Sequence, residues 1–190
     1  VYKRQLETLS RLGIKFDTFT KESKFVVDGS VANLVQKLEK LDIHSVADNG
    51  AYFLDLGQRG LKGKTEFFYR RGDGSSLYAT RDVAYHMWKW GESNRLVNVL
   101  GEDHKLQAKQ VGLTLEELGQ KRPEVLFYSF IKLPEGKMST RQGNVVFMDD
   151  LLEEAHAQAS AVVRELRPEY DDEKVAKIAE AVGTAAVRFN

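Results

Sequence analysis

The residues best suited to chemistry lie in the polar segment 136–144. It combines two cations, Lys137 and Arg141, with the hydroxyls of Ser139 and Thr140. Phosphate groups need charge neutralisation and directed donors, and the glycines at each end would let the backbone approach such a ligand closely. Residue types alone favour a plainer interpretation, a solvated polar turn between two strands. A phosphate-binding loop is the alternative.

The elements that must hold this segment alternate between strand and helix. We predict a short strand at 77–79 running into a helix, a strand at 95–100, a helix ending near Gly119, and a strand at 125–130. This alternation is typical of a doubly wound α/β fold with a parallel sheet. Ligands of such sheets bind outside the carboxyl ends of the strands, where Tyr78, Gly101 and the segment 136–144 would lie.

Two further regions flank this predicted sheet. Residues 1–74 form a predicted α+β unit, and the rest divides into a sheet region at 75–150 and helices at 151–190. The α+β unit is predicted from short patterns: helices at 2–12 and 30–41, and extended runs at 24–27, 45–47, 52–54 and 66–69. The first helix of the third region is predicted to end before Pro168, and Asp149 or Asp150, just before that region, is its predicted cap.

Bulk composition describes an ordinary globular chain. Its 190 residues carry 28 basic and 28 acidic side chains, so bulk charge gives no support to a freestanding nucleic-acid binder. Cysteine is absent, which excludes disulfides, thiolate metal sites and cysteine nucleophiles. No apolar run approaches the roughly 18–20 residues that span a bilayer. We therefore expect a cytoplasmic protein, cut from something longer and without a membrane partner.

Several motifs together resemble one family. Lys-Met-Ser-Thr-Arg at 137–141 is similar to the KMSKS signature of class I aminoacyl-tRNA synthetases, and the following Gly-Asn pair resembles the form found in arginyl-tRNA synthetases. Further resemblance to the arginine enzymes, in order along the chain, is carried by residues 16–17, 22–23, 73–75, 78–85, 99–104 and 182–189. The fold implied is the C-terminal half of a class I Rossmann-type parallel sheet, with an N-terminal α+β insertion and C-terminal helices.

The resemblance implies a two-step reaction. The carboxylate of arginine attacks the α-phosphate of ATP, which gives arginyl-adenylate and pyrophosphate, and the arginyl group then moves to the 3′ end of tRNA(Arg). Lys137, Ser139 and Arg141 are the implied catalytic residues, because charge develops on the leaving pyrophosphate. Met138 would hold the loop against the fold beside ATP. Thr140 replaces the second lysine of the signature, which leaves the division of labour between Lys137 and Arg141 open.

The resemblance also implies the arginine site. Tyr78 and Asp82 match the family's arginine-binding tyrosine and aspartate, and a carboxylate suits a guanidinium. Because the two lie four residues apart across a turn, they can face one pocket. A structural alternative makes Thr80 the cap of a helix and Asp82 a favourable acid in its first turn. Arg81 is then an exposed or ion-paired cation.

Residues 101–104 occupy a predicted strand-to-helix junction, where nucleotides commonly bind. Gly101 would permit close approach of ATP, and Asp103 or His104 could bond the ribose or the amino acid. In the structural alternative, Asp103 caps the helix and His104 lies on its first turn. No metal site is expected at this junction, because no other ligands accompany the two side chains at suitable spacing.

The HIGH-type motif of class I synthetases is absent from the sequence. We therefore expect the remainder of a parent polypeptide to complete the enzyme, and the isolated chain to make no adenylate at a useful rate. L-Arginine, ATP with Mg²⁺, and tRNA(Arg) are the expected ligands, with no tightly bound cofactor. A catalytically inert synthetase-like interaction module is the alternative, and a synthetase for another amino acid is a third reading.

Overall fold

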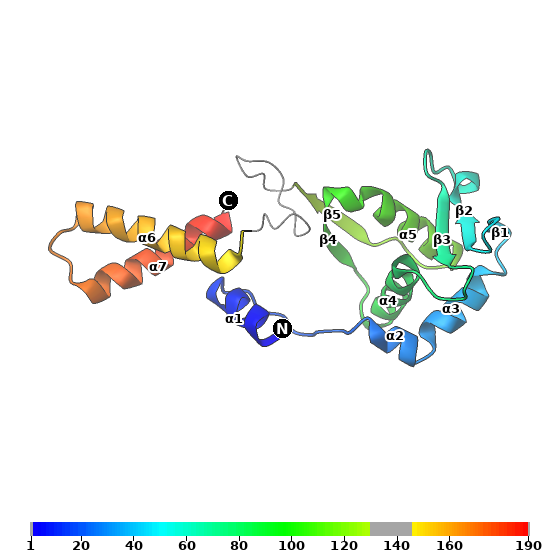
Figure 1. Cartoon of the computed structure of the whole chain (residues 1–190), viewed down its shortest axis with the longest axis horizontal. Helices are drawn as coiled ribbons and strands as arrows, with labels where there is room; N and C mark the ends of the chain where they lie inside the picture. Colours follow the sequence, from blue (N-terminus) through cyan, green and yellow to red (C-terminus); the bar gives the residue numbers. More distant parts are fainter. Residues whose placement is uncertain (1, 130–145, 190) are drawn as a thin grey trace. The chain divides into compact units, whose positions relative to one another are not determined.

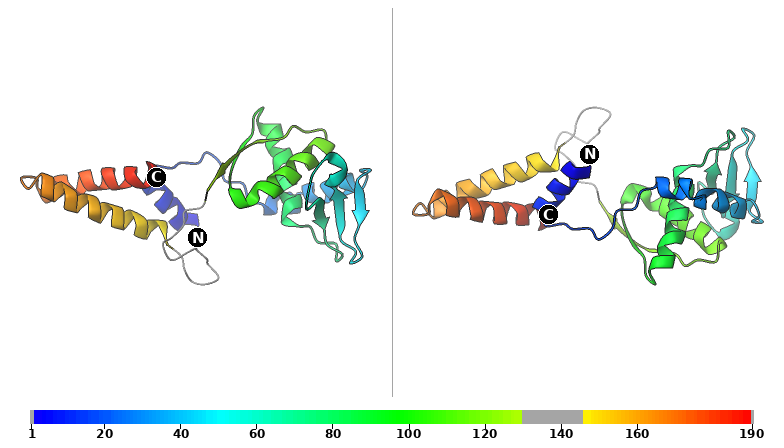
Figure 2. Two further views of the ribbon diagram at one scale, coloured as in Figure 1. Left: turned by 90° about the horizontal axis from the view of Figure 1, so that it is seen from above. Right: turned by 90° about the horizontal axis from the view of Figure 1, so that it is seen from below.

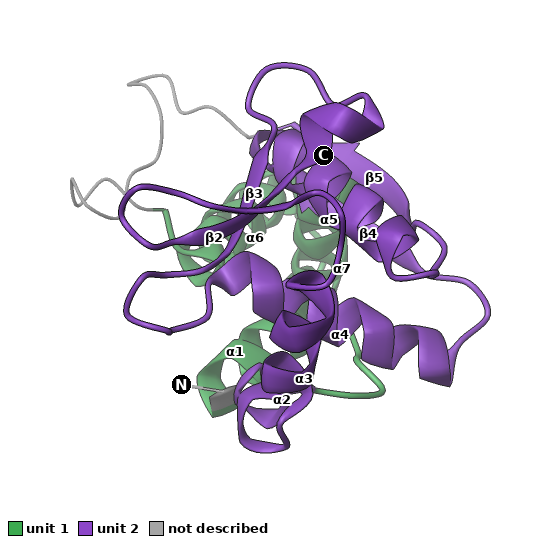
Figure 3. Ribbon diagram, turned by 90° about the vertical axis from the view of Figure 1, so that its right-hand side faces the viewer, with its two compact units in different colours: residues 1–19, 132–190 green, residues 20–131 purple. Residues whose placement is uncertain are grey.

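The computed structural model describes residues 2–129 and 146–189 (Figure 1). The chain forms two compact units (Figure 3). Residues 20–131 make up the first, which we call the sheet unit. Residues 1–19 and 132–190 make up the second, which we call the helical unit. The residues predicted to bind ATP and to act in catalysis, Lys137, Met138, Ser139 and Arg141, lie outside the described residues. The domain boundaries expected at 74 and 150 stay a prediction.

An antiparallel three-stranded sheet occupies one part of the sheet unit, in the order β1-β2-β3. Its strands are β1 (His44–Val46), β2 (Tyr52–Asp55) and β3 (Glu66–Arg70). A tight turn joins the first two strands: the backbone N–H of Ala51 donates to the Asn49 side chain at 3.0 Å, and Gly50 has a φ of +77°. Such a backbone favours glycine. The predicted extended runs at 45–47, 52–54 and 66–69 are therefore confirmed as antiparallel strands.

Two helices and a turn complete the first half of this unit: α2 (Ser23–Val27), α3 (Ser30–Leu38) and the 3-10 helix η1 (Leu56–Arg59). The prediction of a helix starting at Ser30 is confirmed. The prediction of a strand at 24–27 is wrong, because these residues form α2. Phe25, which is 1% exposed, packs its ring against Tyr85 and Trp88. A short apolar run carries no period that separates one helical turn from a strand.

Helix α4 (Tyr78–Glu92) begins earlier than the sequence indicates. Leu77 is its N-cap, so the predicted strand at 77–79 is wrong. The Thr80 hydroxyl donates to the backbone carbonyl of Tyr69 in β3 instead of capping the helix. This bond and the N–H of Leu77, which donates to the same carbonyl at 3.3 Å, attach the start of α4 to the end of β3. The position of Tyr78 and Asp82 thus depends on the antiparallel sheet.

After α4 the chain enters a parallel pair of strands, β4 (Val97–Gly101) and β5 (Glu124–Tyr128). Between them lie the 3-10 helix η2 (Glu102–His104) and α5 (Lys105–Glu117). This β-α-β unit confirms the parallel α/β prediction for 95–130. The expected third strand before α4 does not join this sheet within the described residues. One sheet face is open, since Val99 is 64% exposed and Leu126 60%.

One apolar core serves both parts of the sheet unit. It is built from buried side chains of α2, α3, the antiparallel strands, α4 and α5. Leu38, Leu54, Leu56, Tyr69, Val83 and Leu115 are fully buried within it. Since burying a large apolar side chain contributes about 1.5–3 kcal/mol, this shared core fixes α4 and α5 against the antiparallel sheet.

The helical unit consists of α1 (Tyr2–Arg11), α6 (Met148–Leu166) and α7 (Asp172–Phe189). Figure 2 shows α6 and α7 side by side as an antiparallel hairpin. The prediction that Asp149 or Asp150 caps this helix is wrong, because both lie within its first turn. The Asp149 carboxylate instead pairs with Arg11 of α1 at 2.8 Å and accepts from Thr8 at 3.0 Å. Phe147 is the N-cap. No helix within residues 2–129 and 146–189 combines the length and apolarity required to cross a membrane.

Candidate functional site

A cavity of about 300 Å³ opens beside the first turns of α4. Tyr78 and Asp82 both line it, because residues four apart share one face of a helix. The remaining lining comes from the segment before α2, from α2 itself, from α4 and from α5: Thr20, Glu22, Phe25, Arg81, Tyr85 and Gln107. The structure therefore brings together the two residues that the sequence proposed for arginine.

Tyr78 presents a large, accessible ring to this cavity, since it is 70% exposed. The guanidinium carbon of Arg81 lies 4.4 Å from the centre of that ring. Arg81 also forms an ion pair with Glu22 at 3.2 Å. Among the charges that line the cavity, Arg81 is thus balanced by Glu22, and Asp82 contributes a further carboxylate.

Asp82 is held by donors on two sides. Nδ1 of His86 lies 3.1 Å from Oδ1, and Nε2 of Gln107 donates to Oδ2 at 3.3 Å. Burial raises the pKa of Asp82, but the hydrogen bonds from His86 and Gln107 and the nearby Lys89 ammonium outweigh that effect and hold the pKa below its ordinary value of 3.8. Asp82 is therefore ionised at neutral pH and fixed in orientation.

Gln107 is a site residue that sequence reasoning missed. Its side chain links two candidates, because Nδ1 of His104 lies 3.3 Å from Oε1 while Nε2 donates to Asp82. The donation to a carboxylate requires the nitrogen of the amide to face Asp82, so the amide oxygen is left as an acceptor. One signal was available: Gln107 lies one helical turn beyond the candidate Asp103.

A second cavity, of about 340 Å³, lies between α4, β4 and α5. It shares Asp82, Tyr85 and Gln107 with the first cavity, and His104 lines it as well. Gly101 is buried at the carboxyl end of β4, adjacent to this region. The two cavities thus adjoin at Asp82, Tyr85 and Gln107.

Asp103 is the candidate that the structure does not bring to Tyr78 and Asp82. Its side chain is 55% exposed, it lines neither cavity, and its nearest charged contact is His104 at 3.7 Å. It does not cap α5 either, since the N-cap residue is His104 and no side chain bonds there. Among the described residues, no cluster of three or more His, Asp or Glu side chains could hold a metal ion.

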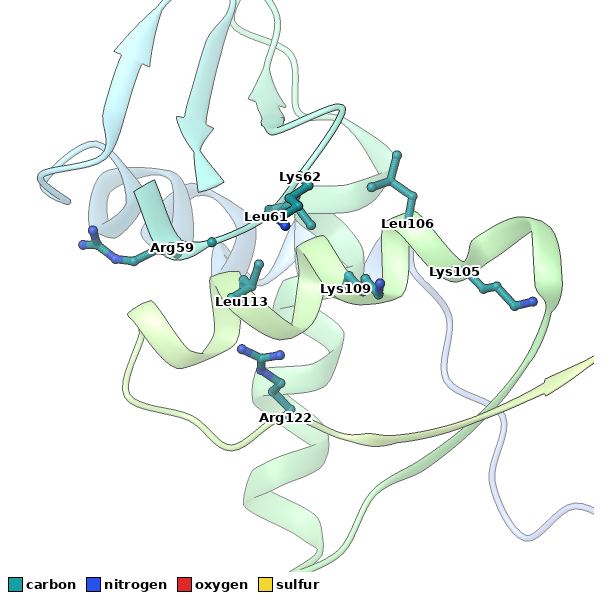
Figure 4. Close-up of a pocket in the computed structure, with 9 residues that line it drawn as sticks. Arg59, Leu61, Lys62, Lys105, Leu106, Lys109, Leu113 and Arg122 are labelled. Atoms are coloured by element: carbon teal, nitrogen blue, oxygen red, sulfur yellow. The ribbon is translucent and has the colours of Figure 1, made fainter. Parts of the chain in front are cut away.

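A larger cavity, about 480 Å³, lies between the turn after η1 and α5 (Figure 4). Its cations are Arg59, Lys62, Lys105, Lys109 and Arg122. Three of these five are paired with acids: Arg59 with Glu117 and Asp42, Lys105 with Glu102, and Arg122 with Glu116. The carboxylates offset most of the positive charge, so this cavity has a weak preference for anions in spite of its basic residues.

Comparison with known proteins decides the family. The family model described as tRNA synthetases class I (R), catalytic domain, matches residues 2–190. The chain belongs to the catalytic domain of the class I arginyl-tRNA synthetases. Arginine–tRNA ligase of Methanocella arvoryzae is 48% identical over 187 residues, which are 98% of this chain and 33% of that protein. Arginine–tRNA ligase of Methanothermobacter thermautotrophicus is 45% identical over 183 residues, 96% of this chain and 32% of that protein.

Solved arginyl-tRNA synthetases share the fold. The Thermus thermophilus arginyl-tRNA synthetase matches with a TM-score of 0.79 at 23% identity, over 97% of this chain and 37% of that one. The Plasmodium falciparum enzyme matches with a TM-score of 0.76 at 14% identity, over 99% of this chain and 31% of that one. The chain thus has an arginyl-tRNA synthetase fold and spans about a third of the length of the curated relatives it matches.

Proposed function

We propose that the parent protein is an arginine–tRNA ligase and that this chain supplies the part of it that recognises the guanidinium group of arginine. The whole protein converts arginine and ATP to arginyl-adenylate and pyrophosphate, and then transfers the arginyl group to tRNA(Arg) in the cytoplasm. The single observation that carries the proposal is Asp82: an ionised, doubly hydrogen-bonded carboxylate in a cavity lined by Tyr78 and Gln107.

The donor and acceptor inventory of the cavity matches arginine. A guanidinium has five N–H donors and no acceptor, and it pairs best with planar oxygen acceptors. Asp82 supplies the carboxylate, Gln107 supplies an amide oxygen, and Tyr78 supplies a ring and a phenol group. A neutral amino acid of the same length would leave the Asp82 carboxylate desolvated without a counter-charge, which costs binding free energy.

We assign ATP, entering with Mg²⁺ as a substrate complex, to the carboxyl end of β4 and to the loop at 137–141. Gly101 permits close approach of the nucleotide, and His104 faces the second cavity. Asp103 is exposed near the same strand end, within reach of a ribose or of the amino acid. Met138 belongs to the proposed ATP site, and Lys137, Ser139 and Arg141 are the groups proposed to neutralise the departing pyrophosphate. In this arrangement arginine and ATP meet beside Asp82 and Gln107.

Amino-acid-dependent ATP–pyrophosphate exchange tests the function. The assay uses the full-length parent protein with its tRNA, because the present chain is about a third of the relatives' length. All twenty amino acids are compared. Exchange with arginine alone is the expected result. Exchange with a different amino acid would keep the class and overturn the specificity, and no exchange with any of them would overturn the proposed function.

The substitution Asp82→Asn tests the guanidinium role. We expect kcat/KM for arginine to fall roughly 100-fold or more, because a charge-assisted pair with the substrate is lost. Asp42→Asn is the matched control, since Asp42 pairs with Arg59 and lines neither site cavity. It should leave arginine kinetics within about twofold of the wild-type protein. Equal kinetics for Asp82→Asn and the wild-type protein would contradict the assignment.

A further inference from the structure

His86 lies directly behind Asp82, one turn further along α4. The residue is only 4% exposed; it does not line the first cavity, but it does line the second. Its Nδ1 lies 2.8 Å from the backbone carbonyl oxygen of Asp82 and 3.1 Å from Oδ1 of the same residue. Its Nε2 lies 2.7 Å from the side-chain nitrogen of Asn98 and 3.2 Å from Nζ of Lys89. Both ring nitrogens are therefore engaged.

The surrounding groups determine which ring nitrogen carries the hydrogen. Nζ of Lys89 donates to Oδ1 of Asn98 at 3.1 Å, so the oxygen of that amide faces Lys89 and its nitrogen faces His86. An amide nitrogen can only donate, and hence Nε2 of His86 accepts. The hydrogen must then sit on Nδ1, where it points at two oxygens of Asp82.

The result is a directed chain of donors that runs from Lys89 through Asn98 and His86 to Asp82. A positive charge stands at one end and a negative charge at the other, so each bond polarises the next in the same sense. Burial lowers the pKa of Lys89, and the Asp82 carboxylate opposes that shift. The Lys89 ammonium also lies 4.5 Å from the centre of the Tyr85 ring. Lys89 is thus held by Asn98, His86 and the Tyr85 ring at the wall of the second cavity.

This chain of donors constrains the Asp82 carboxylate. His86 occupies Oδ1 from behind and Gln107 occupies Oδ2 from α5, so rotation of the carboxylate would break at least one of these bonds. The lone pairs that remain face the cavity that Tyr78 lines. Because a pre-oriented acceptor loses less freedom on binding, affinity for a planar cation increases.

We propose that His86 is a positioning residue for arginine binding: as the Nδ1–H form, held there by Asn98 and Lys89, it fixes the orientation of the Asp82 carboxylate that receives the guanidinium. This inference rests on the proposed function of Asp82. His86 does not line the cavity proposed for arginine and acts on arginine through Asp82. Its contribution is to the KM for arginine rather than to the chemical step.

Steady-state kinetics of the full-length protein with tRNA test the proposal on two substitutions of the same residue. His86→Leu removes both ring nitrogens, and we expect the KM for arginine to rise roughly 10- to 100-fold, while kcat and the KM for ATP stay within about twofold. His86→Asn places an amide nitrogen close to the former Nδ1, so it should restore arginine KM to within about fivefold of the wild-type value. Equal loss in both variants, with ATP KM and kcat also changed, would show a structural role and overturn the proposal.

Asn98→Leu provides a second measurement that keeps His86 in place. It removes the donor to Nε2, and we expect a smaller rise in arginine KM, roughly 3- to 10-fold. His44→Leu is the control for loss of a histidine: His44 bonds the Tyr69 hydroxyl at 2.7 Å in the antiparallel sheet and lines neither cavity. It should leave arginine KM unchanged.

The outcomes separate this proposal from the proposed function. Failure of the wild-type protein to charge tRNA with arginine would overturn the proposed function. A different result is that the wild-type protein charges tRNA normally while His86→Leu and Asn98→Leu both leave the arginine KM unchanged. That result would overturn only the proposed role of His86.

Discussion

Asp82 connects nearly every residue of the candidate site. It accepts from His86 behind it and from Gln107 beside it, and it lines both cavities. Desolvation alone would push a carboxylate toward its neutral form, yet these donors keep it charged. A site that must attract a guanidinium needs this balance, because a protonated acid offers one donor and no charge.

The lowered pKa of Asp82 predicts how the free energy of unfolding depends on pH. A folded-state pKa below the ordinary 3.8 means that ionised Asp82 stabilises the fold at every pH above about 3.8, and that this contribution is lost as pH falls through the lower folded value. We expect the difference in free energy of unfolding between the wild-type protein and Asp82→Asn to be constant from pH 6 to 8 and to shrink under acid. Denaturant unfolding at several pH values measures it. A difference that grows as pH falls would contradict the assigned direction.

Only part of the site could be predicted at the scale of single residues. Tyr78 and Asp82 were found because they fit a motif and share a helical spacing. His86 and Asn98 were not, because a lone histidine or asparagine in a regular element carries no local signal, and Gln107 had only its position one turn beyond Asp103. Their roles arise from contacts between α4, β4 and α5, which the sequence places 9 to 25 residues apart.

At the scale of elements, the sequence predicts best where the pattern is long. The helix at 30–38, the β-α-β unit from 97 to 128 and the antiparallel strands follow from periodicity and turn residues. The short runs at 24–27 and 77–79 were misassigned as strands. In both runs a tertiary contact determines the local structure. The aromatic cluster around Phe25 does so at 24–27, and the hydrogen bonds to the Tyr69 carbonyl oxygen do so at 77–79. Local propensity is a weak guide in such cases.

Gly183 in α7 offers a test of helix packing. A Cβ there would lie 2.5 Å from the ring of His156 in α6 and 2.9 Å from its backbone nitrogen. We expect Gly183→Ala to lower the free energy of unfolding by about 1–3 kcal/mol, although alanine favours helices by about 1 kcal/mol. Gly91→Ala in α4 is the matched control, because its Cβ meets nothing within 4 Å. It should be neutral or stabilising when denaturation is followed by circular dichroism. Equal effects for the two substitutions would contradict the close approach of α6 and α7.

At the scale of the whole molecule, the parallel sheet presents an exposed apolar surface among the described residues. Val99 and Leu126 are neighbours in register, and Val97 and Tyr128 extend the same surface. Exposed apolar patches of this kind usually belong to an interface. Because the relatives are about three times as long, we propose that the remainder of the parent polypeptide covers this face.

This exposure predicts how the isolated chain behaves. We expect it to self-associate at micromolar concentration and the double substitution Val99→Ser with Leu126→Ser to reduce that association strongly. Sedimentation velocity provides the measurement. Since both side chains are more than half exposed, the change should cost little stability. A double variant that associates as strongly as the wild-type chain would show that another surface is responsible.

The division of the chain into units has a consequence for synthesis on the ribosome. The sheet unit is one continuous stretch, so it can fold as soon as residue 131 has left the exit tunnel. The helical unit is discontinuous: Arg11 must wait for Asp149, 138 positions later. At about 5–20 residues per second, α1 waits roughly 7–28 s for its partner helix. During translation α1 therefore remains without its contacts to α6 until that helix has emerged.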